Sequence, residues 1–276
     1  MRHDDARYDA VVIGAGAAGL FCAATAAKRG KKLLVLEHGA ARDFLAHLAS
    51  ALPRPRAIVV ASAHWLTRTP TVDSSARPAT IHDFSGFPAE LEEMRYPAAG
   101  SPELAREIAA LLQADGLGCT LAERGLDHGA WSPLILIYPL ADIPVLQLSL
   151  QPSLGPAHHL RLGRCLARLP ATGVLVLGSG GATHNLGTLS MGRQTAPAWA
   201  TEFDAWLADA ATRGDADALV DYQRQAPHAS QNHPTPEHYL PLLVALGAAG
   251  VGAHGRTLHR SMSYGTLSMA TFAFSQ

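Results

Sequence analysis

The chain has 276 residues, 48% of them hydrophobic, which is enough apolar material for one large α/β domain or two small ones. Its 22 basic and 23 acidic residues nearly cancel and form no long run of one sign, so we expect no nucleic-acid partner and no membrane partner. The cysteines Cys22, Cys119 and Cys165 lack CxxC spacing, which argues against disulfide and zinc-thiolate frameworks. We therefore expect a cytoplasmic protein that acts on a small molecule, with its oligomeric state left open.

The first segment alternates strand, helix and strand. Apolar runs predict strands over 8–13 and 32–36, and a helix over 17–29 lies between them. A dinucleotide-binding fingerprint, with three glycines at the first turn and an acid after the second strand, falls on Gly14, Gly16, Gly19 and Glu37. Such glycines permit a tight turn and a close approach of pyrophosphate, and the acid can accept hydrogen bonds from ribose hydroxyls.

The stretch VVIGAGAAGLFCAATAAKRGKKLLVLEHG resembles the N-terminus of FAD-containing oxidoreductases. Residues 40–55 lack the glycine-rich segment that closes over a flavin, and no second nucleotide fingerprint follows. A single βαβ unit can hold an ADP moiety but not an isoalloxazine ring. We therefore do not expect FAD as a cofactor. The four positions are either vestigial or retain some affinity for a nucleotide, and an FAD-dependent oxidoreductase is the alternative function.

Four histidines further along stand at the ends of predicted elements. His64 follows a buried strand over 57–61, and His184 follows another over 174–178. His128 lies in an Asp-His-Gly turn, and His238 begins a helix that ends near Ala248. Open α/β sheets place ligands at the carboxyl ends of their strands, and imidazole both binds metals and exchanges protons near neutral pH. Surface or packing roles are expected for the remaining downstream histidines His158, His159, His228, His233, His254 and His259.

A series of ordered blocks carries a longer resemblance. LPRPRAIVVASAHW, TIHDFSGFP, LDHGAW, GSGGATHNL, PTPEHYLPLLVALGA and YGTLSM look like the class III extradiol ring-cleavage dioxygenases, in particular the 4,5-DOPA dioxygenase group. The blocks run from about residue 52 to 269, roughly four-fifths of the chain. The resemblance implies an α/β fold whose central, mostly parallel sheet is flanked by helices, here with an appended N-terminal βα unit.

The same resemblance implies a reaction and a set of roles. A metal, Fe(II) or, in the isolated protein, Zn(II), would hold a small aromatic diol for extradiol cleavage by O2. His64 and His238 would bind the metal. His184 would act as general base or orient the substrate, with metal ligation as a second possibility, and His128 would lie beside the diol or oxygen. His82 would line or close the pocket, or pack.

The two resemblances meet at one histidine. The dioxygenase family begins with an apolar strand followed by His-Gly-Ser-Pro, and here the strand over 33–36 leads to His38, which would be the third ligand. Ala40 and Ala41 replace Ser-Pro, and the connection to Leu52 is shorter than in the family. A catalytically impaired metal-binding remnant is therefore a further alternative. The predicted division is 1–39, a Rossmann-like fragment whose second strand is shared with the main sheet, and 40–276, the catalytic domain.

Overall fold

The computed structural model describes residues 8–13, 39–85, 89–189 and 195–276. Its strands are β1 (Ala10–Ile13), β2 (Ala57–Leu66), β3 (Thr71–Asp73), β4 (Thr120–Ala122), β5 (Val145–Leu150), β6 (Val174–Ser179), β7 (His254–His259), β8 (Met262–Ser263), β9 (Leu267–Ser268) and β10 (Thr271–Ser275). Its α-helices are α2 (Gly39–Leu48), α3 (Ala89–Glu93), α4 (Pro102–Ala114), α5 (His128–Ile137), α6 (Gly155–Cys165), α7 (Ala198–Arg213), α8 (Ala216–Val220), α9 (Tyr222–Gln225), α10 (Ala229–Asn232) and α11 (Leu240–Ala248).

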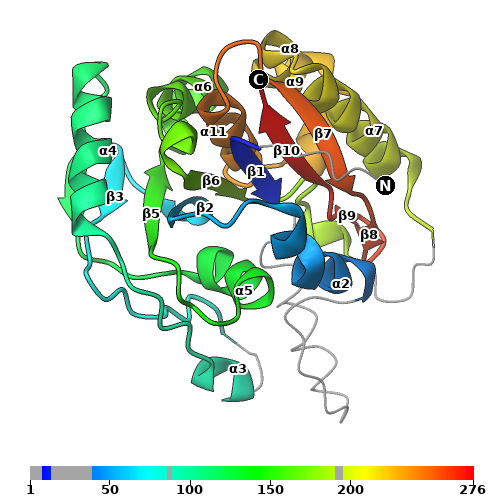
Figure 1. Ribbon diagram of the computed structural model, residues 1–276. Coiled ribbons are helices and arrows are strands. Elements are labelled where there is room, and N and C mark those ends of the chain that lie inside the picture. Colours follow the sequence, from blue (N-terminus) through cyan, green and yellow to red (C-terminus); the bar gives the residue numbers. More distant parts are fainter. Residues whose placement is uncertain (1–7, 14–38, 86–88, 190–194) are drawn as a thin grey trace, which may run out of the picture.

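One large sheet forms the centre of the molecule, in the order β4-β3-β5-β2-β6-β1-β10-β7 (Figure 1). Its middle strands β5, β2, β6 and β1 run parallel to one another. Antiparallel pairs flank this parallel centre at β3–β5 and β1–β10, and β8 pairs with β9 in a separate two-stranded sheet. The predicted α/β fold, a central and mostly parallel sheet flanked by helices, is confirmed.

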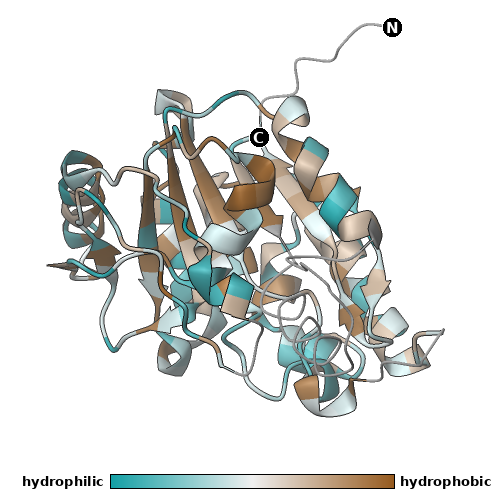
Figure 2. Cartoon of the chain, turned by 90° about the horizontal axis from the view of Figure 1, so that it is seen from below, coloured by the Kyte–Doolittle hydropathy of each residue, from teal (hydrophilic) through white to brown (hydrophobic). Residues whose placement is uncertain are grey.

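Helices cover both faces of the sheet because its central strands are apolar on both sides. In β2, Ala57, Val59 and Ala61 face a core shared with α4, α6, α7 and α11. Ile58 and Val60 face a second core shared with α2 and α5. Figure 2 shows these strands as hydrophobic bands between the helices. The carboxyl ends of β2 and β6 therefore emerge between two packed layers, where side chains are held rigidly.

Three site histidines lie differently from the sequence prediction, and one of them is His128, which was expected in a turn but is the first residue of helix α5. Strand β2 continues to Leu66, so His64 lies inside it, because pairing with β6 extends to Ser62 and pairing with β5 resumes at Leu66. Helix α11 begins only at Leu240, and His238 lies in the turn before it. The prolines at 234 and 236 supply no amide hydrogen and favour this turn over an earlier helix start.

The N-terminal strand of the flavoprotein-like segment lies within the main sheet. Ala10–Ile13 pairs in parallel with β6 and antiparallel with β10, and Ala10 and Val11 are fully buried. The expected second strand over 32–36 lies outside the described residues, so its sharing with the main sheet and the division at residue 39 stay predictions. The first strand of the fragment is thus part of the central sheet.

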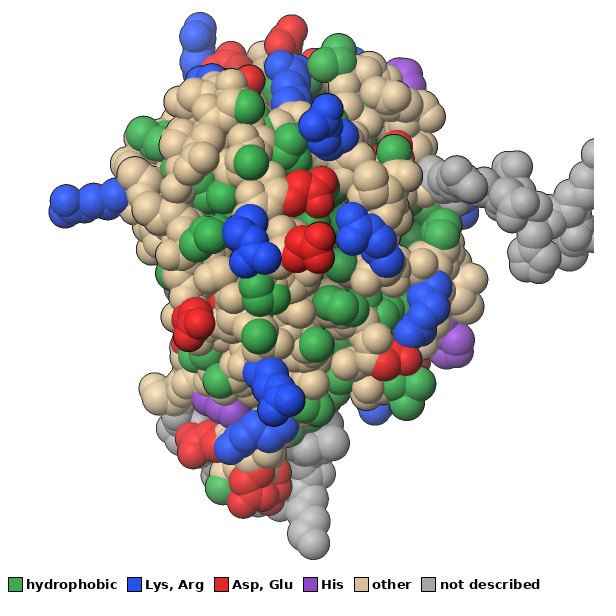
Figure 3. All heavy atoms as spheres, turned by 60° about the vertical axis from the view of Figure 1, so that its left-hand side comes forward, with side chains coloured by type: hydrophobic (Ala, Val, Ile, Leu, Met, Phe, Trp, Pro, Cys, Tyr) green, Lys and Arg blue, Asp and Glu red, His purple; other side chains and the backbone are tan. Residues whose placement is uncertain are grey.

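The surface agrees with the balanced composition. On the face over α4, basic and acidic side chains are interspersed (Figure 3). Within the described ranges, no helix combines the length and apolar character that a membrane span requires.

Candidate metal centre

Four imidazole rings from different parts of the chain come together at the carboxyl end of the sheet. The ring centroids of His64 and His128 are 3.9 Å apart, and those of His64 and His238 are 5.0 Å apart. His184 stacks on His238 at 3.4 Å, with their planes within 6° of parallel. The structure therefore brings together all four histidines that the sequence indicated downstream of residue 52.

A buried carboxylate network joins the two elements that carry His64 and His128. Asp127, which is fully buried, caps α5 by accepting a hydrogen bond from the Ala130 amide at 3.2 Å. It also accepts hydrogen bonds from Ser62 Oγ at 2.8 Å and from Gln147 Nε2 at 2.7 Å. These bonds tie β2 and β5 to the first turn of α5, so they fix the positions at which both histidines enter the site.

Arg124 balances the charge of this network. Its Nη1 donates to Asp127 Oδ2 at 3.0 Å, and its Nη2 donates to the carbonyl oxygen of His64 at 3.4 Å. The guanidinium lies 5.0 Å from the ring centroid of Trp65, within cation–π range. A buried carboxylate needs such a partner because an unpaired charge would be costly to remove from water.

The other two histidines are held by backbone contacts and a second carboxylate. The Gly181 amide donates to the carbonyl oxygen of His238, and the His184 amide donates to that of Asn232, both at 2.9 Å. His238 Nδ1 lies 3.1 Å from Glu237 Oε1, which also accepts from Thr235 Oγ1 at 2.8 Å. A carboxylate on Nδ1 fixes the tautomer that leaves Nε2 able to bind a metal.

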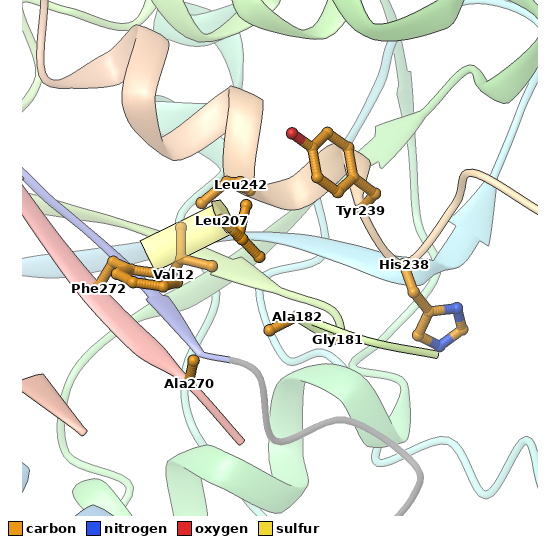
Figure 4. A pocket seen from close by; sticks show the side chains of 9 residues that line it. All are labelled: Val12, Gly181, Ala182, Leu207, His238, Tyr239, Leu242, Ala270 and Phe272. Atoms are coloured by element: carbon orange, nitrogen blue, oxygen red, sulfur yellow. The ribbon is translucent and has the colours of Figure 1, made fainter. Parts of the chain in front are cut away.

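A small cavity separates the base of this site from the core. It measures about 10 Å³, roughly the room of one water molecule, and apolar side chains such as Leu207 and Phe272 surround it. Figure 4 shows that the His238 imidazole points away from these apolar side chains. His238 therefore borders the core through its backbone and offers its ring to the site.

The ring nitrogens that face one another are chemically available. The Nε2 atoms of His64, His128, His184 and His238 are all buried without a hydrogen-bond partner in the described part of the chain. Unpartnered buried polar atoms are costly, and four in one place indicate a missing ligand. The site therefore has the donor set of a histidine-bound metal centre.

Burial keeps three of these imidazoles neutral. It lowers the pKa of His64 to about 4 and that of His238 to about 3, and the pKa of His184 is also lowered by burial. Burial is the largest single influence on the pKa of the Glu237 carboxyl and would raise it, but hydrogen bonds from His238, Thr235 and the backbone amide of Glu237 together outweigh burial and lower that pKa to about 2. Neutral imidazoles with a carboxylate behind them are the form that binds a cation.

The ring spacing distinguishes one pair of these histidines from the other two pairs. Two imidazoles that share one tetrahedral ion through Nε2 stand with ring centroids roughly 5 Å apart. His64 and His238 meet this spacing at 5.0 Å, whereas the His64–His128 and His184–His238 pairs are closer. The residues present thus fit a metal held between His64 and His238, with one histidine on either side.

The remaining predicted positions lie outside the described residues. These are the proposed third ligand His38 and the nucleotide fingerprint Gly14, Gly16, Gly19 and Glu37. Helix α2 starts directly after His38, at Gly39, and packs against α5. The described chain therefore resumes beside the helix that carries His128.

Sequence reasoning missed two carboxylates behind the site, Asp83 and Asp127, whereas it indicated Glu237 as a helix-start carboxylate or a partner of a metal-binding residue rather than a ligand. In the TIHDFSGFP block it singled out His82, whose Nε2 lies 3.0 Å from the carbonyl oxygen of Met94 and whose ring lies beside Phe84 and Trp131. The neighbouring Asp83 instead contacts His128, with Oδ1 2.8 Å from Nδ1. The sequence contains one signal for Asp127, because Asp is a preferred N-cap residue immediately before a helix.

Comparison with known proteins gives the same picture. The family model for the catalytic LigB subunit of aromatic ring-opening dioxygenase matches residues 37–274, and an FAD-binding domain model matches residues 9–52, so the two overlap over residues 37–52. A "4,5-DOPA dioxygenase extradiol" from Beta vulgaris is 47% identical over 224 residues, which cover 80% of this chain and 83% of that protein. One from Escherichia coli K12 is 43% identical over 223 residues, covering 79% and 82%.

A solved structure extends the likeness to the fold. The crystal structure of an uncharacterized protein from Escherichia coli K12 superimposes with a TM-score of 0.76 at 34% sequence identity, and the match covers 96% of this chain and 98% of that one. With a family model over most of its length, two relatives above 40% identity and this shared fold, the chain belongs to the LigB family of extradiol ring-opening dioxygenases.

Proposed function

We propose that this protein cleaves the ring of a catechol-type substrate with O2 at a bond beside the diol. The observation that carries this proposal is the convergence of four buried, unpartnered Nε2 atoms at the carboxyl end of a parallel sheet. Such a donor set leaves room for substrate oxygens after two or three imidazoles have bound an ion. The names of the relatives from Beta vulgaris and Escherichia coli support the same substrate class.

The proposed metal ligands are His64 and His238, with His38 as the third from the sequence. When bound, the metal, which we assign as Fe(II), supplies a Lewis acid for both diol oxygens and a redox centre for O2. Zn(II) can take its place in isolated protein, because an all-histidine site also suits zinc. His38 matters because two imidazoles alone bind a divalent ion weakly.

Two histidines act on the substrate from opposite sides. His184 stacks on His238, and its lowered pKa leaves it unprotonated at neutral pH, so it can accept a proton from a diol hydroxyl. His128 approaches from the side of His64 and presents its free Nε2 to the diol or to oxygen. The rings of Phe84 and Trp131, whose centroids are 6.2 Å apart, supply apolar surface next to His128.

The test is a turnover assay on protein loaded anaerobically with Fe(II). We expect catechol or DOPA with O2 to give a yellow ring-opened product, and we expect a chelator to abolish turnover and added Fe(II) to restore it. A metal-filled protein that shows no turnover would identify an impaired remnant and overturn the proposal. Flavin absorbance bands in purified protein would instead favour the oxidoreductase alternative.

A further inference from the structure

Asp83 is a carboxylate beside the four histidines to which the reaction above assigns no role. It lies between β3 and α3, and its side chain is 24% exposed, whereas that of His128 is 4% exposed. A single oxygen, Oδ1, accepts from His128 twice: from the backbone amide at 3.0 Å and from ring Nδ1 at 2.8 Å. Asp83 thus holds both the first residue of α5 and the ring of that residue.

These two hydrogen bonds determine which nitrogen of His128 reaches the site. An ionised carboxylate only accepts hydrogen bonds, so Nδ1 must carry the proton. In neutral imidazole the free lone pair is then on Nε2, which is buried, has no hydrogen-bond partner among the described residues and lies on the ring that contacts His64. Without the carboxylate, the ring could change tautomer or rotate.

The same contact positions an apolar wall. Phe84 follows Asp83 directly, and its ring meets that of His128 nearly edge-on with centroids 5.8 Å apart. Phe84 also lies beside Trp131, which is fully buried in the same helix as His128. Asp83 therefore fixes the loop that brings an aromatic side chain next to the free face of the histidine.

We propose that Asp83 is a positioning residue that holds His128 as the Nδ1–H tautomer and aims its Nε2 at the substrate diol. The catalytic consequence of this inference rests on the proposed function, whereas the tautomer of His128 does not depend on it. Because Asp83 acts through His128, its removal should slow turnover without releasing the metal. A hydrogen-bond acceptor of the same shape should replace it.

The catalytic test compares Asp83→Ala and Asp83→Asn in Fe(II)-loaded enzyme with DOPA as the probe. We expect Asp83→Ala to lower kcat by about 10- to 100-fold with little change in KM, as for other partners of site histidines. Asp83→Asn should restore kcat to within about threefold, because its amide oxygen can accept both bonds. If Asp83→Asn is as slow as Asp83→Ala, orientation by hydrogen bonding is not the role of Asp83.

A double-mutant cycle shows whether the effect passes through His128. Asp83→Ala should cause no further loss in a His128→Ala background, and equal losses in both backgrounds would overturn the proposal. A matched control is Glu202→Ala, since Glu202 also pairs with a histidine, His228, at 2.9 Å, but the side chains of this pair are exposed. This control should leave kcat unchanged. If Asp83→Ala does not fold, Asp83→Ser removes the carboxylate with a smaller change in polarity.

A readout independent of turnover separates this inference from the proposed function. In metal-free protein with ¹⁵N-labelled histidine, the NMR signals of His128 should show a protonated Nδ1 in the wild type and in Asp83→Asn, and mixed tautomers in Asp83→Ala. Zn(II) affinity should stay within about threefold in Asp83→Ala. An unchanged tautomer, or loss of zinc, would overturn the positioning role, whereas a wild type without turnover but with this tautomer would overturn only the proposed function.

Discussion

The site consists of two halves, and each half contains two histidines and a carboxylate that contacts one of them. In the first half, His64 on β2 contacts His128 at the start of α5, and Asp83 holds the Nδ1 atom of His128. A buried network around Asp127 connects the two elements. The outer carboxylate of this half therefore supports the histidine that flanks the proposed metal.

The second half combines its parts differently. His184, which follows β6, stacks on His238, and Glu237 holds the Nδ1 atom of His238. Here the carboxylate supports the histidine that faces His64 across the 5.0 Å gap. A carboxylate behind a histidine therefore does not distinguish the proposed ligand from the flanking histidine, whereas the ring spacing across the two halves favours His64 and His238 as the proposed ligands.

The largest expected effect separates ligands from flanking histidines. His64→Ala should abolish metal binding, because it removes one of the two rings at ligand spacing. His184→Ala should retain the metal and lower kcat by about 100- to 10,000-fold, as expected for loss of a general base. Metal content after dialysis and turnover of Fe(II)-loaded protein measure the two effects. If His184→Ala also loses the metal, His184 is itself a ligand, and its assignment as a general base that does not bind the metal is wrong.

A second prediction compares the two supporting carboxylates. Glu237→Ala should lower metal affinity by about 10- to 100-fold, because the ring of His238 loses the acceptor that fixes its tautomer. Glu237→Gln should recover most of that affinity, and Asp83→Ala should leave it almost unchanged. Titration of the metal-free variants with Zn(II) measures these affinities. Equal losses for Glu237→Ala and Asp83→Ala would remove the distinction between the halves.

The sequence predicted the fold and four site residues because those signals are local. Buried strands read as apolar runs, and His64, His128, His184 and His238 stand at the ends of predicted elements inside family blocks. The carboxylates were harder to predict, because Asp83 and His128 are 45 positions apart and no local pattern pairs them. Likewise, the sequence around β1 resembles a flavoprotein, and only the pairing of β1 with β6 on one side and β10 on the other shows that it belongs to the main sheet.

Backbone packing offers a third comparison between the halves. A Cβ atom on Gly129 would lie 2.4 Å from Ser62 Oγ and 2.9 Å from His64 Cδ2, whereas one on Gly181 would come no closer than 3.2 Å to the Thr183 carbonyl oxygen. Gly129→Ala should therefore destabilise the protein by about 1–3 kcal/mol, despite the better helix propensity of alanine. Gly181→Ala should cost less than about 1 kcal/mol. Denaturant unfolding measures both, and equal costs would contradict the closer contacts at Gly129 than at Gly181.

The last prediction concerns His159, a buried histidine outside both halves. Its Nε2 lies 3.0 Å from the Gln151 amide nitrogen, from which it accepts, and its Nδ1 lies 2.7 Å from the Gly155 carbonyl oxygen. Both nitrogens are therefore satisfied, unlike the Nε2 atoms of the site histidines. Burial lowers the pKa of His159 from 6.5 to about 4, so between these values the unfolded chain binds more protons and stability falls as the pH falls.

This loss should reach about 2 kcal/mol at pH 5 relative to neutral pH, and His159→Gln should lack that part of the pH dependence. Denaturant unfolding of the metal-free proteins at pH 7 and pH 5 measures the difference. Zn(II) should raise the stability of the wild type and of His159→Gln equally, because His159 has no free nitrogen to offer a metal. A smaller zinc effect in His159→Gln would contradict the assignment of His159 to packing outside the site.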